Sequence, residues 1–113
     1  MSSITTHVLD LASGRPAEGV GVALEIKEED GWRLLGAGAT DGDGRLRDLL
    51  PDDQGLETGT YRLTFDTGGY FDETGTAAFY PEAVVTFRVA HPAQHYHVPL
   101  LLSPFGYSTY RGS

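Results

Sequence analysis

The sequence has no cysteine, a single lysine and no long apolar run, and each absence removes a class of protein. Without cysteine the chain forms neither disulfides nor thiolate metal sites. No apolar stretch approaches the roughly 18 residues that a membrane-spanning helix needs. The opening segment MSSITTHVLD lacks the basic and apolar regions of a secretory signal, and the final Arg-Gly-Ser is not a peroxisomal address of the Ser-Lys-Leu type. We therefore expect a soluble, cytoplasmic protein.

Basic residues as a class are also scarce. Lys and Arg together number 8 against 16 Asp and Glu, which gives a formal net charge of −8. Nucleic acids and anionic membranes bind through basic surfaces, so we expect neither as a partner. A chain of 113 residues with 40% hydrophobic and 21% charged residues is typical of one globular domain, and we expect residues 1–113 to form a single domain around one modest core.

Period-two alternation of apolar and polar residues is the main structural signal in the chain. It is clearest over residues 20–26, 61–66 and 83–89, and it indicates strands with one face in a core. Segments of turn-forming residues separate the strands at 12–16, 29–31, 41–44 and 67–69. One short helix is expected near residues 69–75. The predicted fold class is therefore all-β, a sandwich of about eight strands in two sheets with one short helix.

The four histidines are the first candidates for chemistry. His95 and His97 lie two residues apart on an expected strand, so their side chains share one face. Such a pair suits acid–base catalysis, a zinc site completed by a third histidine, or an ordinary surface. The lack of cysteine and of a neighbouring carboxylate argues against zinc. Spacing alone leaves these alternatives open for the pair, and likewise for His7 and His91.

Two other features are unusual for a small sandwich. Arg45 directly follows the glycine-rich turn 41–44, where a guanidinium can present a rigid fork of donors to a carboxylate or carbonyl, although such an arginine is more often simply solvated. The C-terminal segment LLLSPFGYSTYRGS is apolar and aromatic, whereas chain ends are usually polar and frayed. We expect it to reverse at 103–106 and return beside its own strand, which brings Ser113 next to His97.

Two long segments carry a family resemblance. HVLDLASGRPAEGV (residues 7–20) and YHVPLLLSPFGYS (residues 96–108) match the two signatures of the transthyretin family, the second almost position by position. The intervening segment FYPEAVVTFRV (residues 79–89) is compatible with the same family. The sequence thus resembles this family over nearly its whole length, which implies a transthyretin-like (prealbumin-like) sandwich.

The resemblance extends to the hydrolase branch of that family. Its markers fall here on His7, Arg45, His97 and the terminal Tyr-Arg-Gly-Ser at 110–113, a set that thyroid-hormone carriers lack. The implied reaction is hydrolysis of a ring amide of 5-hydroxyisourate, in urate degradation, to 2-oxo-4-hydroxy-4-carboxy-5-ureidoimidazoline. The resemblance implies no metal and no organic cofactor. It also implies a homotetramer, a dimer of dimers, with the sites between dimers.

Roles for these residues follow as expectations from the implied reaction. Hydrolysis of an amide needs a base for water and donors for the developing oxyanion. We expect His7 and His97 to share the proton transfers, with the order undecided, and Arg45 to hold the substrate. Tyr110 and Ser113 are expected to bind substrate and close the pocket. A carrier without catalysis and a structural interaction domain are the alternative functions.

Overall fold

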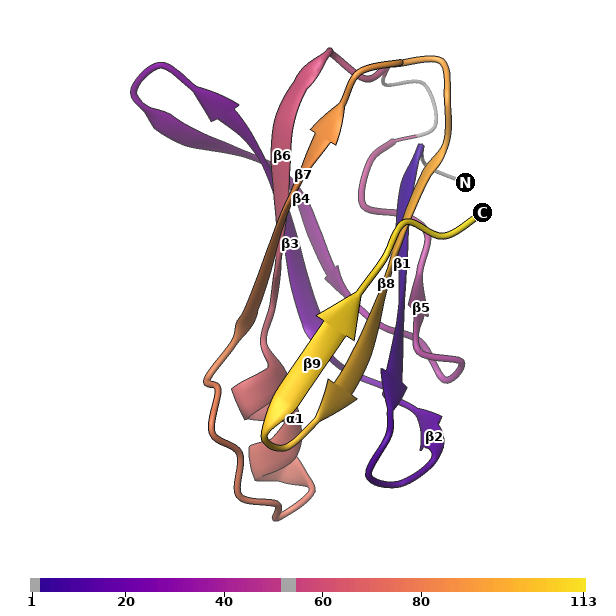
Figure 1. The fold of residues 1–113 in the computed structure, drawn as a ribbon, viewed down its shortest axis with the longest axis vertical. Helices are drawn as coiled ribbons and strands as arrows, with labels where there is room; N and C mark the ends of the chain where they lie inside the picture. The colour runs from indigo at the N-terminus through magenta and orange to yellow at the C-terminus, as the bar shows by residue number, and fades with distance from the viewer. Residues whose placement is uncertain (1–2, 52–54) are drawn as a thin grey trace.

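The computed structural model describes residues 3–51 and 55–113, which form two sheets packed face to face (Figure 1). One sheet has the strand order β2-β1-β8-β9, with β5 also paired to β1, and the other has the order β4-β3-β6-β7. The elements in chain order are β1 (Ile4–Asp10), β2 (Arg15–Pro16), β3 (Gly21–Glu28), β4 (Gly31–Ala39), β5 (Arg45–Leu46), β6 (Gly59–Phe65), α1 (Thr67–Glu73), β7 (Ala83–Val89), β8 (Tyr96–Ser103) and β9 (Gly106–Thr109). The expected all-β sandwich with one short helix is confirmed.

Alternation places the core where the sequence predicts it. On β3 the side chains of Val22, Leu24 and Ile26 are buried, and on β6 those of Leu63 and Phe65 are buried in the same core. Every second side chain of a strand points to the same face, so these residues fill the space between the sheets while their neighbours face outward. Among the described residues, no helix has the length and apolarity needed to cross a membrane.

The pairing of β1 with β8 is parallel and joins the two ends of the chain. Its register sets Thr5 opposite His97 and His7 opposite Pro99. Because the core-facing side chains of β1 include Ile4, the side chains of Thr5 and His7 lie on the other face of the same sheet. This pairing therefore brings the first and the last histidine of the sequence onto one outward surface.

One expected turn is wrong. Residues 67–69 begin helix α1, because the Asp66 side chain caps the helix by accepting a hydrogen bond from the backbone N–H of Gly69 at 3.0 Å. Phe71 and Thr67 bury one side of the helix against the core. A Cβ at Gly68 would lie 2.6 Å from the carbonyl oxygen of Pro81, so this glycine reflects close packing. The expected helix near 69–75 starts two residues earlier than predicted.

Asp10, from the first signature, has a structural role. Its carboxylate accepts hydrogen bonds from the backbone N–H groups of Ala12 at 2.9 Å and Ser13 at 3.2 Å, which shape the turn after β1. It also accepts a hydrogen bond of 2.7 Å from the Tyr70 hydroxyl on α1. Burial, followed by this bond to Asp10, raises the pKa of Tyr70 to about 12. Asp10 thereby ties the helix to the end of β1.

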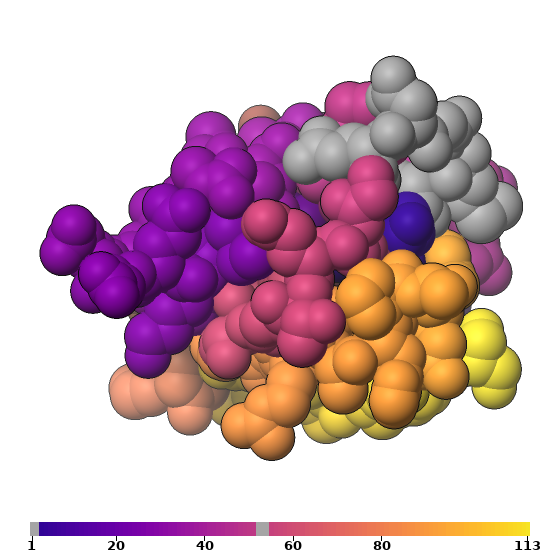
Figure 2. Space-filling model, turned by 90° about the horizontal axis from the view of Figure 1, so that it is seen from above, coloured from indigo at the N-terminus to yellow at the C-terminus, as the bar shows by residue number. Residues whose placement is uncertain are grey.

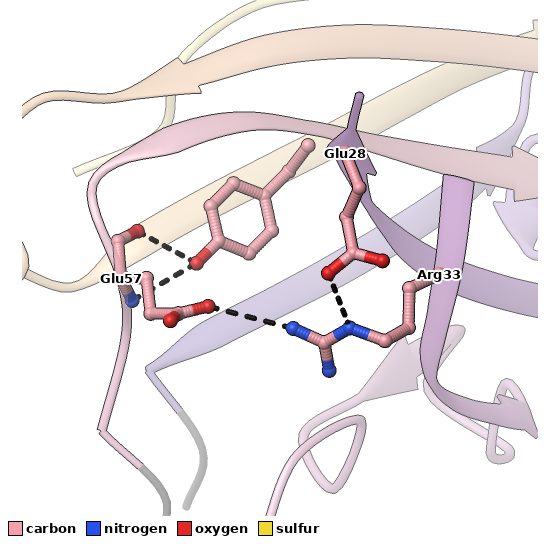
Figure 3. A network of polar contacts seen from close by, with 4 residues as sticks. Glu28, Arg33 and Glu57 are labelled. Carbon is pink, nitrogen blue, oxygen red and sulfur yellow. Dashed lines mark hydrogen bonds and ion pairs between the residues drawn. The ribbon is translucent and has the colours of Figure 1, made fainter. Parts of the chain in front are cut away.

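The opposite end of the sandwich carries the projecting β3–β4 hairpin. Figure 2, which looks down on this end, shows the hairpin in purple on one side and the C-terminal residues in yellow on the other. Close to the turn of the hairpin Arg33 forms ion pairs with Glu28 at 2.8 Å and Glu57 at 3.5 Å, and the Tyr61 hydroxyl donates to the Glu57 carbonyl at 2.7 Å (Figure 3). These ion pairs are well exposed, so water and salt screen them and each contributes little to the stability of the fold.

Candidate active site

The turn before β5 positions the first candidate, Arg45. One oxygen of the Asp41 carboxylate accepts hydrogen bonds from the backbone N–H groups of Asp43 at 2.9 Å and Arg45 at 3.0 Å. These bonds lower the pKa of Asp41, and the bond from Arg45 N–H has the largest effect. The nearby charges of Arg47 and Arg45 lower the pKa further. Gly44 has a φ of +75°, and a Cβ there would lie 2.4 Å from the Val8 carbonyl oxygen. The glycine-rich turn therefore sets Arg45 directly against β1.

His7 stands opposite Arg45 in the pairing of β1 with β5. Its Nε2 lies 2.9 Å from the carbonyl oxygen of Asp43. A carbonyl can only accept, so Nε2 carries a hydrogen and donates it. The neutral His7 ring therefore keeps Nδ1 as its unprotonated nitrogen.

His97 lies on the neighbouring strand, β8, in a half-buried position. Its pKa is lowered, most strongly by burial, then by the positive charge of Arg45, and less by His7 and His95. A hydrogen bond with the Thr5 backbone opposes this shift. The ordinary value for histidine is 6.5. His97 is therefore predominantly neutral at pH 7 and able to accept a proton.

Behind His97 lies a residue that the sequence did not single out. The Thr5 hydroxyl is 2.8 Å from Nδ1 of His97 and 2.9 Å from Nε2 of His95. Thr5 is 4% exposed, so both contacts are shielded from bulk water at the hydroxyl. The signal that could have found it is its spacing, two residues before His7 on the same face of one strand.

A hollow of about 380 Å³ collects most of these groups on the outer face of the sheet. Its lining residues are Thr5, Thr6, Arg45, Arg47, His95, His97 and Ser113. Its volume is at the lower end of the range for small-molecule sites. The second arginine, Arg47, was not predicted from the sequence, although it lies two residues after Arg45. Two guanidinium groups make this place locally basic on an otherwise acidic chain.

The C-terminal tail closes one side of the hollow. The backbone N–H of Gly112 donates to the carbonyl oxygen of His97 at 2.8 Å, in an antiparallel bridge beyond β9. The Arg111 guanidinium lies 4.5 Å from the centre of the Tyr96 ring and donates to the Gln94 side chain at 3.1 Å. The structure thus places Ser113 in the hollow beside His97.

The remaining candidates lie elsewhere on the monomer. Tyr110 is 58% exposed and lines a different hollow of about 230 Å³, between β7 and the strands β8 and β9. Within one copy of the chain it does not line the hollow that holds Arg45 and Ser113, so its contact with substrate stays a prediction. His91 is exposed. Its backbone N–H donates to the Tyr96 hydroxyl at 3.0 Å, and its carbonyl oxygen accepts from that hydroxyl and from the Gln94 N–H, each at 3.0 Å.

Within residues 3–51 and 55–113, no group of three or more His, Cys, Asp or Glu side chains has the arrangement of a metal site. The two neighbouring histidines direct ring nitrogens at the Thr5 hydroxyl instead. The arrangement offers a neutral imidazole, a second imidazole of fixed tautomer and two guanidinium groups. These are the groups that activate water and stabilise negative charge on oxygen.

Comparison with known proteins agrees with this chemistry. Residues 4–112 match the model of the HIUase/Transthyretin family. The chain is 48% identical over 110 residues to the 5-hydroxyisourate hydrolase of Salmonella dublin, covering 97% of this chain and 80% of that protein. The structure of Klebsiella pneumoniae 5-hydroxyisourate hydrolase is similar with a TM-score of 0.85 and 37% identity, covering 100% of this chain and 94% of the other. Sea bream transthyretin in complex with thyroxine gives a TM-score of 0.89 and 36% identity, covering 97% and 94%. The expected transthyretin-like fold is confirmed.

Proposed function

The chain belongs to the HIUase/Transthyretin family, and from that membership we propose that it is a hydrolase of 5-hydroxyisourate. The proposed product is 2-oxo-4-hydroxy-4-carboxy-5-ureidoimidazoline, formed by addition of one water to a ring amide. The observation that carries the proposal is the convergence of Arg45, His97 and Ser113 in one hollow, with His7 paired beside Arg45. No metal or organic cofactor is assigned to the reaction.

We assign the role of general base to His97. Its lowered pKa keeps the ring neutral at pH 7, and the nitrogen that does not face Thr5 is available to water. As the water oxygen bonds to the ring carbonyl carbon, His97 takes one water proton. The carbonyl electron pair moves onto oxygen, and its negative charge is stabilised by the Arg45 guanidinium.

The second half of the reaction falls to His7. When the tetrahedral centre collapses, the C–N bond breaks and the leaving nitrogen needs a proton. The proton that His97 took from water returns through solvent to Nδ1 of His7, the unprotonated nitrogen of the neutral ring, and passes from there to the leaving nitrogen. Nε2 continues to donate to the Asp43 carbonyl, so the ring keeps its orientation through the reaction. Water is thereby divided between the new carboxyl group and the new N–H.

We propose that Ser113 and Tyr110 complete the substrate pocket, Ser113 from the same chain and Tyr110 in an assembled oligomer. The proposed assembly is a homotetramer, a dimer of dimers, with the sites between dimers. The exposed large hydrophobic residues support it, since surfaces of this kind commonly mark protein contacts. They are Leu11, Leu34, Phe79, Tyr80, Val84, Phe105, Tyr107 and Tyr110. Light scattering of the purified protein tests the tetramer, and a fully active monomer would contradict it.

Two further parts of the proposal concern the chain as a whole. Residues 1–113 are proposed to act as one hydrolase domain, and the family match over 4–112 supports this. The proposed location is the cytoplasm, in keeping with a small polar substrate and a chain that has no cysteine.

A carrier that holds a small aromatic ligand is the second candidate. It is favoured by the similarity to a transthyretin that was solved with thyroxine. A protein that only carries a ligand does not need a neutral, half-buried histidine such as His97 in one hollow with Arg45 and Arg47. Fold alone does not decide between a carrier and a hydrolase, so a measurement of substrate turnover is needed.

The deciding assay generates 5-hydroxyisourate in place from urate and urate oxidase and follows its ultraviolet decay. The protein should accelerate the decay well beyond the spontaneous rate. His7→Ala and His97→Ala should each reduce the rate by about 10²-fold or more, the range of positioned acid–base groups. His91→Ala serves as the control and should keep the full rate, because its side chain is exposed and does not line the hollow. Decay at the spontaneous rate with the intact protein would refute the hydrolase.

A further inference from the structure

The contact between Thr5 and two histidines has a consequence for His97. The hydroxyl has one hydrogen, so it can donate to His95 or to His97 but not to both. At least one ring must therefore carry a proton on the nitrogen that faces Thr5. Which ring does so determines which nitrogen of His97 is free to act as a base.

We propose that Thr5 and His95 form a relay that positions His97, in which Nδ1–H of His97 donates to the Thr5 hydroxyl and the hydroxyl donates to Nε2 of His95. This inference rests on the proposed hydrolase function. It leaves Nε2 of His97 unprotonated, and this atom has no hydrogen-bond partner in the described part of the chain. Thr5 and His95 are positioning residues, because they act through His97.

The relay also gives the abstracted proton a way out. When Nε2 of His97 takes a proton from water, the Nδ1 proton passes to Thr5 Oγ1, and the hydroxyl proton passes to Nε2 of His95. His97 ends as a neutral ring protonated on Nε2, Thr5 is unchanged, and His95 becomes a cation. One proton has moved from His97 to His95, and no bond other than N–H and O–H has formed or broken.

The surroundings favour this direction of transfer. Groups of positive or potentially positive charge face His97 from three elements. They are His7 on β1, Arg45 and Arg47 on or after β5, and His95 before β8. A cation held on His97 is disfavoured there by burial and by the arginine charges. His95 is exposed, so the same charge on His95 is solvated by water.

The first test reads the tautomer of His97 directly and needs no substrate. Long-range ¹H–¹⁵N correlation spectra of the ¹⁵N-labelled protein distinguish rings protonated on Nδ1 from rings protonated on Nε2. We expect the Nδ1–H form for His97. Thr5→Val removes the hydroxyl but keeps the shape and strand preference of the side chain, and should move His97 to the Nε2–H form. Thr5→Ser should restore the Nδ1–H form.

The matched control is Thr40→Val. Thr40 is as buried as Thr5, at 4% exposed, and its hydroxyl also makes two hydrogen bonds, to the Ala17 carbonyl at 2.6 Å and from the Val20 N–H at 2.9 Å. It lies away from the histidines, so its loss should leave the His97 tautomer as it is. A tautomer change in both valine variants would attribute the effect to general destabilisation and overturn the role of Thr5.

The second test is kinetic. Thr5→Val should lower kcat by at least about tenfold with KM within about threefold, and Thr5→Ser should recover most of kcat, since the hydroxyl acts on the base and not on substrate binding. His95→Gln keeps a polar side chain that cannot carry the proton. It should lower kcat several-fold, and added imidazole buffer should restore part of the loss, because position 95 is exposed.

The outcomes separate the relay from the enzyme. An Nε2–H form of His97 in the intact protein, or full kcat in Thr5→Val, overturns the positioning relay. Full kcat in His95→Gln without imidazole overturns the proton exit through His95. If the intact protein fails to accelerate 5-hydroxyisourate decay, the hydrolase proposal falls, and the tautomer spectra still decide the hydrogen-bonding order of the three side chains.

Discussion

Gly112→Ala is the sharpest single test of the site geometry. A Cβ at position 112 would lie 2.5 Å from Cδ2 and 3.2 Å from Cγ of the His97 ring, and 3.3 Å from Cγ of Pro99. Carbon atoms in contact prefer separations of about 3.5 to 4.0 Å. The ring or the tail must therefore move by about 1 Å to admit one methyl group.

Either movement damages the site. If the ring moves, it leaves the Thr5 hydroxyl, from which its Nδ1 now stands 2.8 Å. If the tail moves, the 2.8 Å bond from Gly112 N–H to the His97 carbonyl breaks and Ser113 leaves the hollow. A displacement of about 1 Å at a reacting group costs on the order of 10²-fold in rate, so we expect a kcat loss of that size.

The fold should survive the substitution, because Gly112 lies beyond the last strand and contributes nothing to the core. Initial rates of 5-hydroxyisourate decay are measured beside circular dichroism and thermal unfolding. Gly106→Ala on the same hairpin is the control, since its Cβ would meet only Ser103 Oγ at 3.8 Å, an ordinary contact. A Gly112→Ala protein with kcat within about twofold of the parent would refute the close approach of tail and ring.

Three further predictions test the site by other means. Burial and the Arg45 charge lower the pKa of His97, so its neutral form persists to lower pH than that of an ordinary histidine. The apparent pKa of the acid limb in a plot of kcat/KM against pH should therefore lie below 6.5, and an apparent pKa at or above 6.5 would remove His97 as the base. Deleting residues 110–113 should lower kcat by about 10²-fold or more while circular dichroism stays unchanged, and a truncated protein that keeps the full rate and assembly would exclude a role for the tail. Prolonged EDTA treatment should leave activity intact, and loss of activity that added zinc restores would establish a metal requirement.

Much of the fold follows from local patterns in the sequence. Alternation at Val22, Leu24 and Ile26 predicts a strand and its buried face, because a period of two fixes both at once. The segment 67–69 misleads because glycine usually marks a turn, whereas here Asp66 caps a helix and Gly68 packs against Pro81. Close packing such as that of Gly68 depends on a residue distant in sequence, here Pro81, which a local sequence pattern does not reveal.

The site was predictable where a family signature marks a residue, and less so where geometry alone does. His7, Arg45 and His97 carry the markers, and the structure brings them together. Thr5 has no such marker, since its importance comes from the register that sets it opposite His97, across 92 positions of sequence. The place of Tyr110 depends on contacts outside one copy of the chain.

The parallel pairing of β1 with β8 also has a consequence for how the protein is made. During synthesis Ile4–Asp10 leaves the ribosome first, and its partner strand Tyr96–Ser103 is among the last segments to follow. The edge of β1 that pairs with β8 therefore stays unpaired for most of translation, although β2 and β5 can already pair with β1. Closing so long a loop delays completion of this sheet until translation is nearly finished. The surface that holds Thr5 and His97 is therefore completed only shortly before the chain is released from the ribosome. A ribosome stalled before residue 96 should hold a chain in which Thr5 lacks its partner His97 on β8, and hydrolysis should begin only when β8 and the tail after it have been made.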